Sequence, residues 1–181
     1  MASVLIAGIG NIFQGDDAFG VSVVQKVAGI RFPENVRVMD IGIRSLDLAF
    51  ALLEQFDQVI LVDAAARGGL PGTLYTIEIS PDDVPHSDEQ VGLVNSHALD
   101  PVRVLTMAKS MGARFGKIIL VACEPLALDH DETGHIGLSD PVAAAVDPAV
   151  SILVRLVEEF TQHQKSSDNQ KEEEACAHEL G

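Results

Sequence analysis

The segment at residues 8–21 constrains the fold of this chain more than any other. An apolar run at residues 4–7 ends in a glycine-rich turn, and two adjacent carboxylates, Asp16 and Asp17, follow before the next apolar pattern begins. Such a continuous apolar run is typical of a strand buried on both faces of a parallel sheet, and this strand is expected to be central. Open α/β folds bind their ligands where a strand ends and the next helix begins. Because the groups gathered there are anionic, the segment favours a cation over a phosphate.

The strand-then-helix pattern recurs along the chain. Three further apolar runs are expected to be strands, at residues 36–40, 58–63 and 117–122. Helical spacing of apolar residues is found at 18–28, 46–53, 99–108 and 142–157. Residues 73–79 alternate in polarity with no helix before them, which predicts an antiparallel strand at a sheet edge. The sequence therefore predicts an α/β fold, a three-layer αβα sandwich around a five-stranded, mostly parallel sheet with one antiparallel strand.

Length and charge narrow the classes of protein to which the chain can belong. Its 181 residues, 47% of them hydrophobic, suffice for one domain, expected at residues 1–163. Residues 164–181 are acidic and polar, which predicts a disordered tail. The net charge of −15 opposes binding to nucleic acid or to anionic membranes. The chain has only two cysteines, which do not form a disulfide framework and so favour a reducing compartment. Its start does not resemble a leader, and no apolar run is long enough to cross a membrane. We therefore expect a cytoplasmic protein.

Three polar residues are expected at the carboxyl edge of the predicted sheet. Asp17 follows the first strand, Asp63 ends the third, and His97 begins the helix after a long polar loop. Two carboxylates and an imidazole suit a divalent transition metal, with positions left open for water or substrate. Each residue also has a purely structural explanation. Carboxylates favour helix starts, aspartates cap their own turns, and a lone imidazole is often at the surface.

Further residues are expected to support this edge. Asp16 is interpreted as the solvated carboxylate of the helix start, and Asp40 with Gly42 as the organiser of a loop beside the site. The alternative is that these three residues belong to a loop that contacts the substrate. Gly15 and Gly20 are expected to serve the turn and the packing of the helix on the sheet.

Other chemistries fit the sequence less well. Residues 130–135 contain two histidines, but neither their order nor their glycine suits a helical zinc motif. Cys123 has no assignable activating partner, so a buried core thiol is expected. Gly8 and Gly10 resemble part of a dinucleotide fingerprint, yet Phe13 occupies the third glycine position and the acids oppose a pyrophosphate.

The motif Gly-Ile-Gly-Asn-x-x-x-x-Asp-Asp-x-x-Gly-Val at residues 8–21 resembles the opening of the [NiFe]-hydrogenase maturation proteases. The resemblance spans about residues 4–160. Four more features follow in the family's order: Asp40-x-Gly42, Val62-Asp63-Ala64, Ser96-His97, and Glu124-Pro125 followed by Gly137-Leu138-Ser139.

The resemblance implies a cytoplasmic, aspartic-type endopeptidase that removes the carboxy-terminal extension of a [NiFe]-hydrogenase large-subunit precursor after nickel insertion. It implies that nickel carried by the precursor is the recognition signal, that no organic cofactor is needed, and that Asp17, Asp63 and His97 are the metal-binding and catalytic residues. Asp17 stands where some members have glutamate, which leaves Asp16 as an alternative ligand. The loop 40–44 lacks the double glycine of some relatives, which leaves open the particular hydrogenase that is processed. The alternative hypothesis is a non-catalytic nickel-binding chaperone or docking module for hydrogenase assembly.

Overall fold

A computed structural model of the chain describes residues 3–85, 101–126 and 136–178. The strands form one five-stranded sheet in the order β2-β1-β3-β5-β4. Their bounds are Val4–Ile9 for β1, Val36–Gly42 for β2, Gln58–Ala64 for β3, Leu74–Ile79 for β4 and Lys117–Cys123 for β5. β1, β2, β3 and β5 run parallel, and β4 pairs antiparallel with β5. The mixed sheet predicted from the sequence is therefore confirmed.

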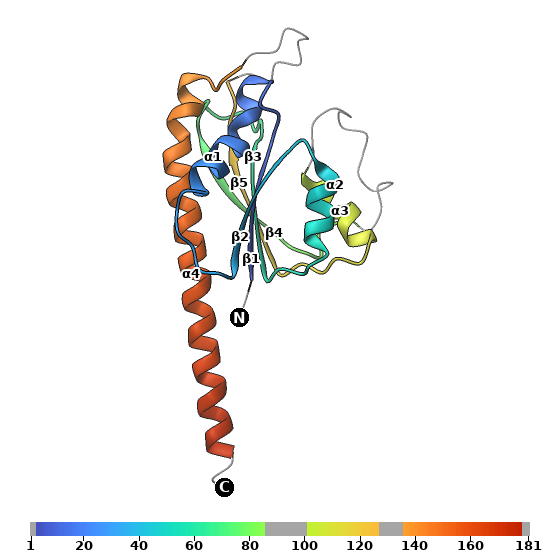
Figure 1. Cartoon of the computed structure of the whole chain (residues 1–181), viewed down its shortest axis with the longest axis vertical. Coiled ribbons are helices and arrows are strands. Elements are labelled where there is room, and N and C mark those ends of the chain that lie inside the picture. The colour runs from blue at the N-terminus through green and yellow to red at the C-terminus, as the bar shows by residue number, and fades with distance from the viewer. Residues whose placement is uncertain (1–2, 86–100, 127–135, 179–181) are drawn as a thin grey trace.

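Helices cover both faces of the sheet, as Figure 1 shows. They are the 3₁₀ turn η1 at Gly15–Ala18, α1 at Phe19–Val27, α2 at Ser45–Leu52, α3 at Pro101–Ser110 and α4 at Asp140–His178. α1 and α4 pack together on one face, and α2 and α3 on the other (Figure 1). This is the three-layer αβα arrangement that the sequence predicts.

Two apolar cores lie on opposite faces of the sheet, because successive strand residues point to opposite sides. In β1, Val4 and Ile6 belong to the core under α1 and α4, whereas Leu5 and Ala7 belong to the core under α2 and α3. β1 is interior and buried throughout, but the middle position of the sheet is held by β3. β4 is an edge strand with alternating exposure, as predicted.

The last helix extends far beyond the sheet. Its first half packs along α1 and its second half projects past the amino ends of the strands (Figure 1). The backbone is helical through His178, which lies beyond the domain boundary expected at residue 163. The division into a domain and a tail at that residue stays a prediction. In the described parts of the chain, no helix is both long and apolar enough to cross a lipid bilayer.

Two glycines let α1 approach the sheet closely. A Cβ atom added at Gly20 would lie 2.2 Å from the carbonyl oxygen of Val62 and 2.3 Å from that of Ile9. One added at Gly8 would lie 2.4 Å from the carbonyl oxygen of Gly20. The helix backbone therefore rests directly on the ends of β1 and β3, which confirms the packing role predicted for Gly20. Gly15 has a φ of +54°, which confirms its predicted role in the turn.

We expect Gly20→Ala to destabilise the fold by about 3 kcal/mol, because its methyl group has no room between two backbone oxygens. Urea unfolding monitored by circular dichroism measures this loss. The matched control is Gly29→Ala, just beyond α1, where the added Cβ makes only an ordinary contact of 3.5 Å with the Lys26 carbonyl. Equal stability of the two variants would contradict the close contact between α1 and the sheet.

Candidate functional site

Asp17 and Asp63 both lie at the carboxyl edge of the parallel strands. Asp17 is half-buried in η1, and its Oδ2 accepts a hydrogen bond of 2.6 Å from the amide of Asn11. Asp63 is buried near the end of β3, and its Oδ1 accepts a hydrogen bond of 2.9 Å from the amide of Ala64. Since η1 packs against β3, the two carboxylates come from neighbouring elements.

His97, the third predicted ligand, lies outside the described residues, as do the two histidines of residues 130–135. Within the described ranges, no three His, Cys, Asp or Glu side chains are grouped so that they could hold a metal ion. The ligand and catalytic roles of Asp17, Asp63 and His97 therefore stay predictions.

The turn before η1 is built to place Asp17. Gly10 has a φ of +133°, and a Cβ atom there would lie 1.7 Å from the carbonyl oxygen of Asp17. The side chain of Asn11 accepts a hydrogen bond of 3.0 Å from the amide of Phe13, and its carbonyl accepts one of 3.0 Å from Gln14. Only glycine allows this close crossing of the chain, so the motif holds Asp17 over the end of β1.

Asp16 has a different role from the one expected. Its side chain is buried rather than solvated, with 4% of its surface exposed. Oδ1 accepts a hydrogen bond of 2.7 Å from the amide of Ser139, and Oδ2 accepts one of 2.8 Å from the amide of Leu126 and one of 2.9 Å from the Ser139 hydroxyl. The expectation of a solvated carboxylate was wrong, because η1 turns Asp16 toward segments more than 100 residues away in the chain.

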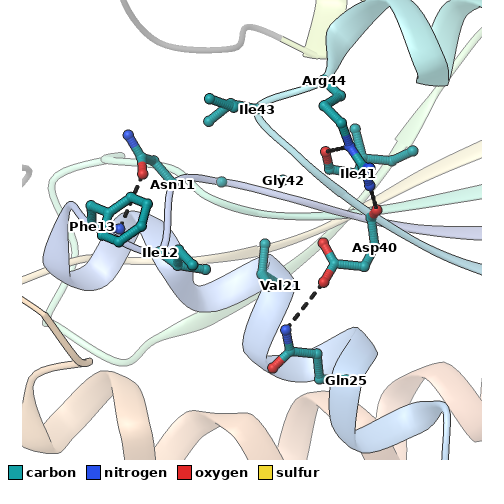
Figure 2. Close-up of a pocket in the computed structure, with 11 residues that line it drawn as sticks. Asn11, Ile12, Phe13, Val21, Gln25, Asp40, Ile41, Gly42, Ile43 and Arg44 are labelled. Atoms are coloured by element: carbon teal, nitrogen blue, oxygen red, sulfur yellow. Dashed lines mark hydrogen bonds between the residues drawn. The ribbon is translucent and has the colours of Figure 1, made fainter.

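Asp40 and Gly42 lie beside the glycine turn, as Figure 2 shows. The exposed side chain of Asp40 accepts a hydrogen bond of 3.1 Å from the amide of Gln25, and the carbonyl of Gly42 accepts one of 3.1 Å from Gly10. The guanidinium of Arg44 donates to the backbone carbonyls of Asp40 and Ile41. The loop that follows β2 is thus bonded to the turn that leads to Asp17. This agrees with the prediction that Asp40 and Gly42 organise a loop beside the site.

Glu124 is a buried carboxylate that was not predicted to be a site residue. It belongs to the Glu124-Pro125 motif that resembles the family. It accepts hydrogen bonds of 2.9 to 3.0 Å from the amides of Arg67 and Gly68 and from the Tyr75 hydroxyl. Burial alone would raise the pKa of Glu124, but hydrogen bonds from Arg67, Gly69, Tyr75 and Gly68 outweigh it and hold the pKa below its ordinary value. Glu124 therefore fixes, as an anion, the loop that follows Asp63.

Cys123 is fully buried in the core. Burial, followed by the nearby carboxylates of Asp16 and Glu124, raises the pKa of its thiol to about 11. A thiol with this pKa is protonated near neutral pH and is a poor nucleophile. The predicted core thiol is confirmed.

The comparisons with known proteins agree on one family. A family model described as hydrogenase maturation protease matches residues 21–156, three quarters of the chain. The chain belongs to the hydrogenase maturation protease family. It is 35% identical over 153 residues to the hydrogenase expression/formation protein HupD of Rhodobacter capsulatus, covering 84% of this chain and 70% of that protein.

Solved structures of the family share the fold. The hydrogenase 2 maturation peptidase of Thaumarchaeota archaeon SCGC_AB-539-E09 superposes with a TM-score of 0.65 at 29% identity, over 86% of this chain and 98% of that one. The hydrogenase maturating endopeptidase HybD of E. coli gives a TM-score of 0.67 at 25% identity, over 87% and 93%. The family resemblance inferred from the motifs is thus confirmed, and with it the assignment of the chain to a class of proteases.

We expect Asp16→Asn to lower the free energy of unfolding by about 2 kcal/mol, because the amide group cannot replace a carboxylate that accepts three hydrogen bonds. Denaturant titration measures this loss. Ser139→Ala, which removes only the hydroxyl donor, should cost about 1 kcal/mol. An Asp16→Asn variant no less stable than Ser139→Ala would contradict the anchoring role.

The lowered pKa of Glu124 predicts a pH dependence of stability. The Glu124 carboxylate stabilises the fold fully above its ordinary pKa of 4.5, and this contribution is lost as the pH falls through the lower pKa of the folded state. We therefore expect Glu124→Gln to be less stable than the wild type at neutral pH, with a difference that shrinks below pH 4.5. Thermal melts across the acid range measure it. A difference that stays constant down to the acid limit would contradict this assignment.

Proposed function

We propose that this protein is an endopeptidase that removes the carboxy-terminal extension of a [NiFe]-hydrogenase large-subunit precursor after nickel insertion. The proposal extends the family membership to a particular substrate and bond. The observation that supports it best is the placement of Asp17 and Asp63, from neighbouring elements, at the ligand-binding edge of the sheet. We also propose that the reaction takes place in the cytoplasm, as the resemblance of the sequence motifs implies.

We further propose that nickel arrives with the precursor and is the recognition signal. Asp17, Asp63 and His97 would contact it, since imidazole and carboxylate groups are suitable ligands for a divalent transition metal. The amide of Asn11 orients the carboxylate of Asp17 through a hydrogen bond of 2.6 Å. A hydrogen-bond donor beside a ligand carboxylate fixes the direction of its metal-binding oxygen. In this scheme the protease needs no resident metal and no organic cofactor.

The same carboxylates are candidates for the chemistry of cleavage. A nickel ion shared by precursor and protease would hold the scissile bond beside Asp17 and Asp63, which raises the rate through proximity. A carboxylate at this edge can accept the proton of the attacking group and return it to the leaving amine. A thiol mechanism through Cys123 is disfavoured by its burial and raised pKa. These points support an aspartic-type endopeptidase.

The direct test incubates the purified protein with nickel-loaded and metal-free precursor and follows the loss of the extension by mass spectrometry. We expect cleavage of the nickel-loaded form alone. Asp17→Ala, Asp63→Ala and His97→Ala should each lower the rate at least about 100-fold, because each removes a ligand or a proton acceptor. Asp147→Ala is the matched control, since this aspartate is exposed on α4 and should leave the rate unchanged.

Two outcomes would contradict the proposal. Equal cleavage of both forms of the precursor would exclude nickel as the signal. Nickel-dependent binding without any cleavage would favour the alternative, a nickel-binding chaperone or docking module.

A further inference from the structure

Arg67 lies at the same edge of the sheet as the candidate site. β3 ends at Ala64, and Arg67 is the third residue of the loop that leads from there to β4. It is also the fourth residue after Asp63, so even a fully extended chain keeps the two Cα atoms within about 14 Å of each other. The side chain of Arg67 is exposed. This edge therefore presents a cation close to one of the two candidate carboxylates.

The main chain of Arg67 is fixed by Glu124. Both oxygens of this buried carboxylate accept hydrogen bonds from the amide of Arg67, at 3.0 and 2.9 Å, and Oε1 accepts another of 3.0 Å from the amide of Gly68. These donors belong to the backbone, so the loop keeps its anchor when the side chain of Arg67 is replaced. The guanidinium is therefore not needed to hold the loop.

The ring of Tyr75 orients the guanidinium of Arg67. Its Cζ atom lies 5.6 Å from the centre of the ring, within the range of a cation–π contact. The hydroxyl of Tyr75 donates a hydrogen bond of 3.0 Å to Oε2 of Glu124. One buried carboxylate thus positions both the backbone of Arg67 and the ring against which its side chain packs. A guanidinium that is already oriented loses less conformational entropy when it binds an anion.

The guanidinium of Arg67 forms no ion pair with any residue that the structure describes. Arg37, by contrast, pairs with Glu54 at 2.7 Å. A guanidinium can bind a carboxylate through two parallel hydrogen bonds, which gives the contact both strength and direction. The chemistry of Arg67 therefore fits a carboxylate supplied by another molecule.

In the proposed reaction, the precursor is the molecule that reaches this edge of the sheet. An extended peptide advances about 3.3 Å per residue, so a residue within about four positions of a scissile bond beside Asp63 can reach Arg67. The protein carries a net charge of −15, which repels carboxylates from most of its surface. Arg67 would offset this repulsion at one position of the precursor.

We propose that Arg67 binds a carboxylate of the precursor close to the scissile bond and thereby helps to select the precursor. The carboxylate is either an acidic side chain or the terminal carboxylate of the extension. The inference rests on the proposed function, because it assumes that a precursor is cleaved beside Asp63. The arrangement that carries it is the guanidinium of Arg67, held against Tyr75 in the loop that follows Asp63.

The test compares Arg67→Gln with the wild type in processing of nickel-loaded precursor at low and at high salt. We expect KM to rise about fivefold at low salt with kcat nearly unchanged, the effect of losing one exposed ion pair that contributes to binding. High salt should bring the KM of the wild type close to that of the variant, because dissolved ions screen exposed charges. Arg67→Lys keeps the charge without the planar fork and should lie between the two.

The matched control is Arg114→Gln. It removes the same charge from an exposed arginine between α3 and β5, at the opposite edge of the sheet, and should leave KM unchanged. Thermal melts should show that every variant is folded, since the bonds to Glu124 come from the backbone. A rise in KM that is equal for Arg67→Gln and Arg114→Gln would show only a general effect of charge and would overturn the proposal.

A second arm changes the precursor. Each acidic side chain within about four residues of the scissile bond is replaced by its amide, one at a time, and in a further variant added glycines move the terminal carboxylate away. The change that removes the partner of Arg67 should raise the KM of the wild type about fivefold and that of Arg67→Gln much less. An amide variant with this behaviour assigns an acidic side chain, and the lengthened variant assigns the terminal carboxylate. If no change distinguishes the two proteins, the proposal is wrong.

Failure of this contact and failure of the proposed function give different results. Calorimetry of the precursor with each protein measures binding even without cleavage, and weaker binding by Arg67→Gln than by Arg114→Gln supports the contact. Absence of cleavage by the wild type would contradict the proposed function alone. Processing and binding by Arg67→Gln at the wild-type level would overturn the role of Arg67 and leave the proposed function standing.

Discussion

The contact between α1 and the ends of β1 and β3 is the constraint on which the rest of this structure depends. It exists because Gly8 and Gly20 have no side chains where the helix backbone meets the strand backbone. Any Cβ atom at Gly20 would overlap two carbonyl oxygens, so the helix would have to move outward. The turn that joins β1 to α1 is short and would move with it. The position of the carboxylate pair is therefore set by a steric requirement of backbone packing.

Two adjacent acids have opposite roles because they lie on a 3₁₀ turn. With three residues per turn, neighbouring side chains point about 120° apart. Asp16 is directed into the protein and binds Leu126 and Ser139, while Asp17 stays half-buried at the sheet edge. One carboxylate thus anchors Leu126 and Ser139, and its neighbour lies at the edge where the metal site is predicted. The Asp-Asp pair couples the fold to the candidate site in a single turn.

Local patterns predicted most of the architecture. The apolar runs, the alternation in β4 and the helical spacing each depend on neighbouring residues, and the strands, the antiparallel edge and the packing role of Gly20 followed from them. The burial of Asp16 and the anchoring role of Glu124 were not predictable in this way. Their partners are distant in sequence, Ser139 for the first and Arg67 for the second, and no spacing rule connects them.

The candidate site, like the fold, was predictable only where its residues follow from local patterns. Strand ends placed Asp17 and Asp63 at one edge of the sheet, because carboxyl ends of parallel strands meet there. The contact between the loop after β2 and the turn after β1 required the structure, since Gly10 and Gly42, which join them by a hydrogen bond, are distant in the sequence. The metal-binding role of Asp17, Asp63 and His97 stays a prediction, which rests on the family resemblance and on donor chemistry.

The most direct measurement is X-ray absorption at the nickel edge, on nickel-loaded precursor mixed with this protein and frozen before cleavage is complete. If Asp17 and Asp63 bind the nickel of the precursor, the wild-type mixture should show added oxygen or nitrogen ligands compared with precursor alone. Asp17→Ala and Asp63→Ala should each reduce that change, whereas Asp147→Ala should not. An unchanged nickel spectrum in a mixture that goes on to cleave would contradict the central claim that these carboxylates recognise the metal.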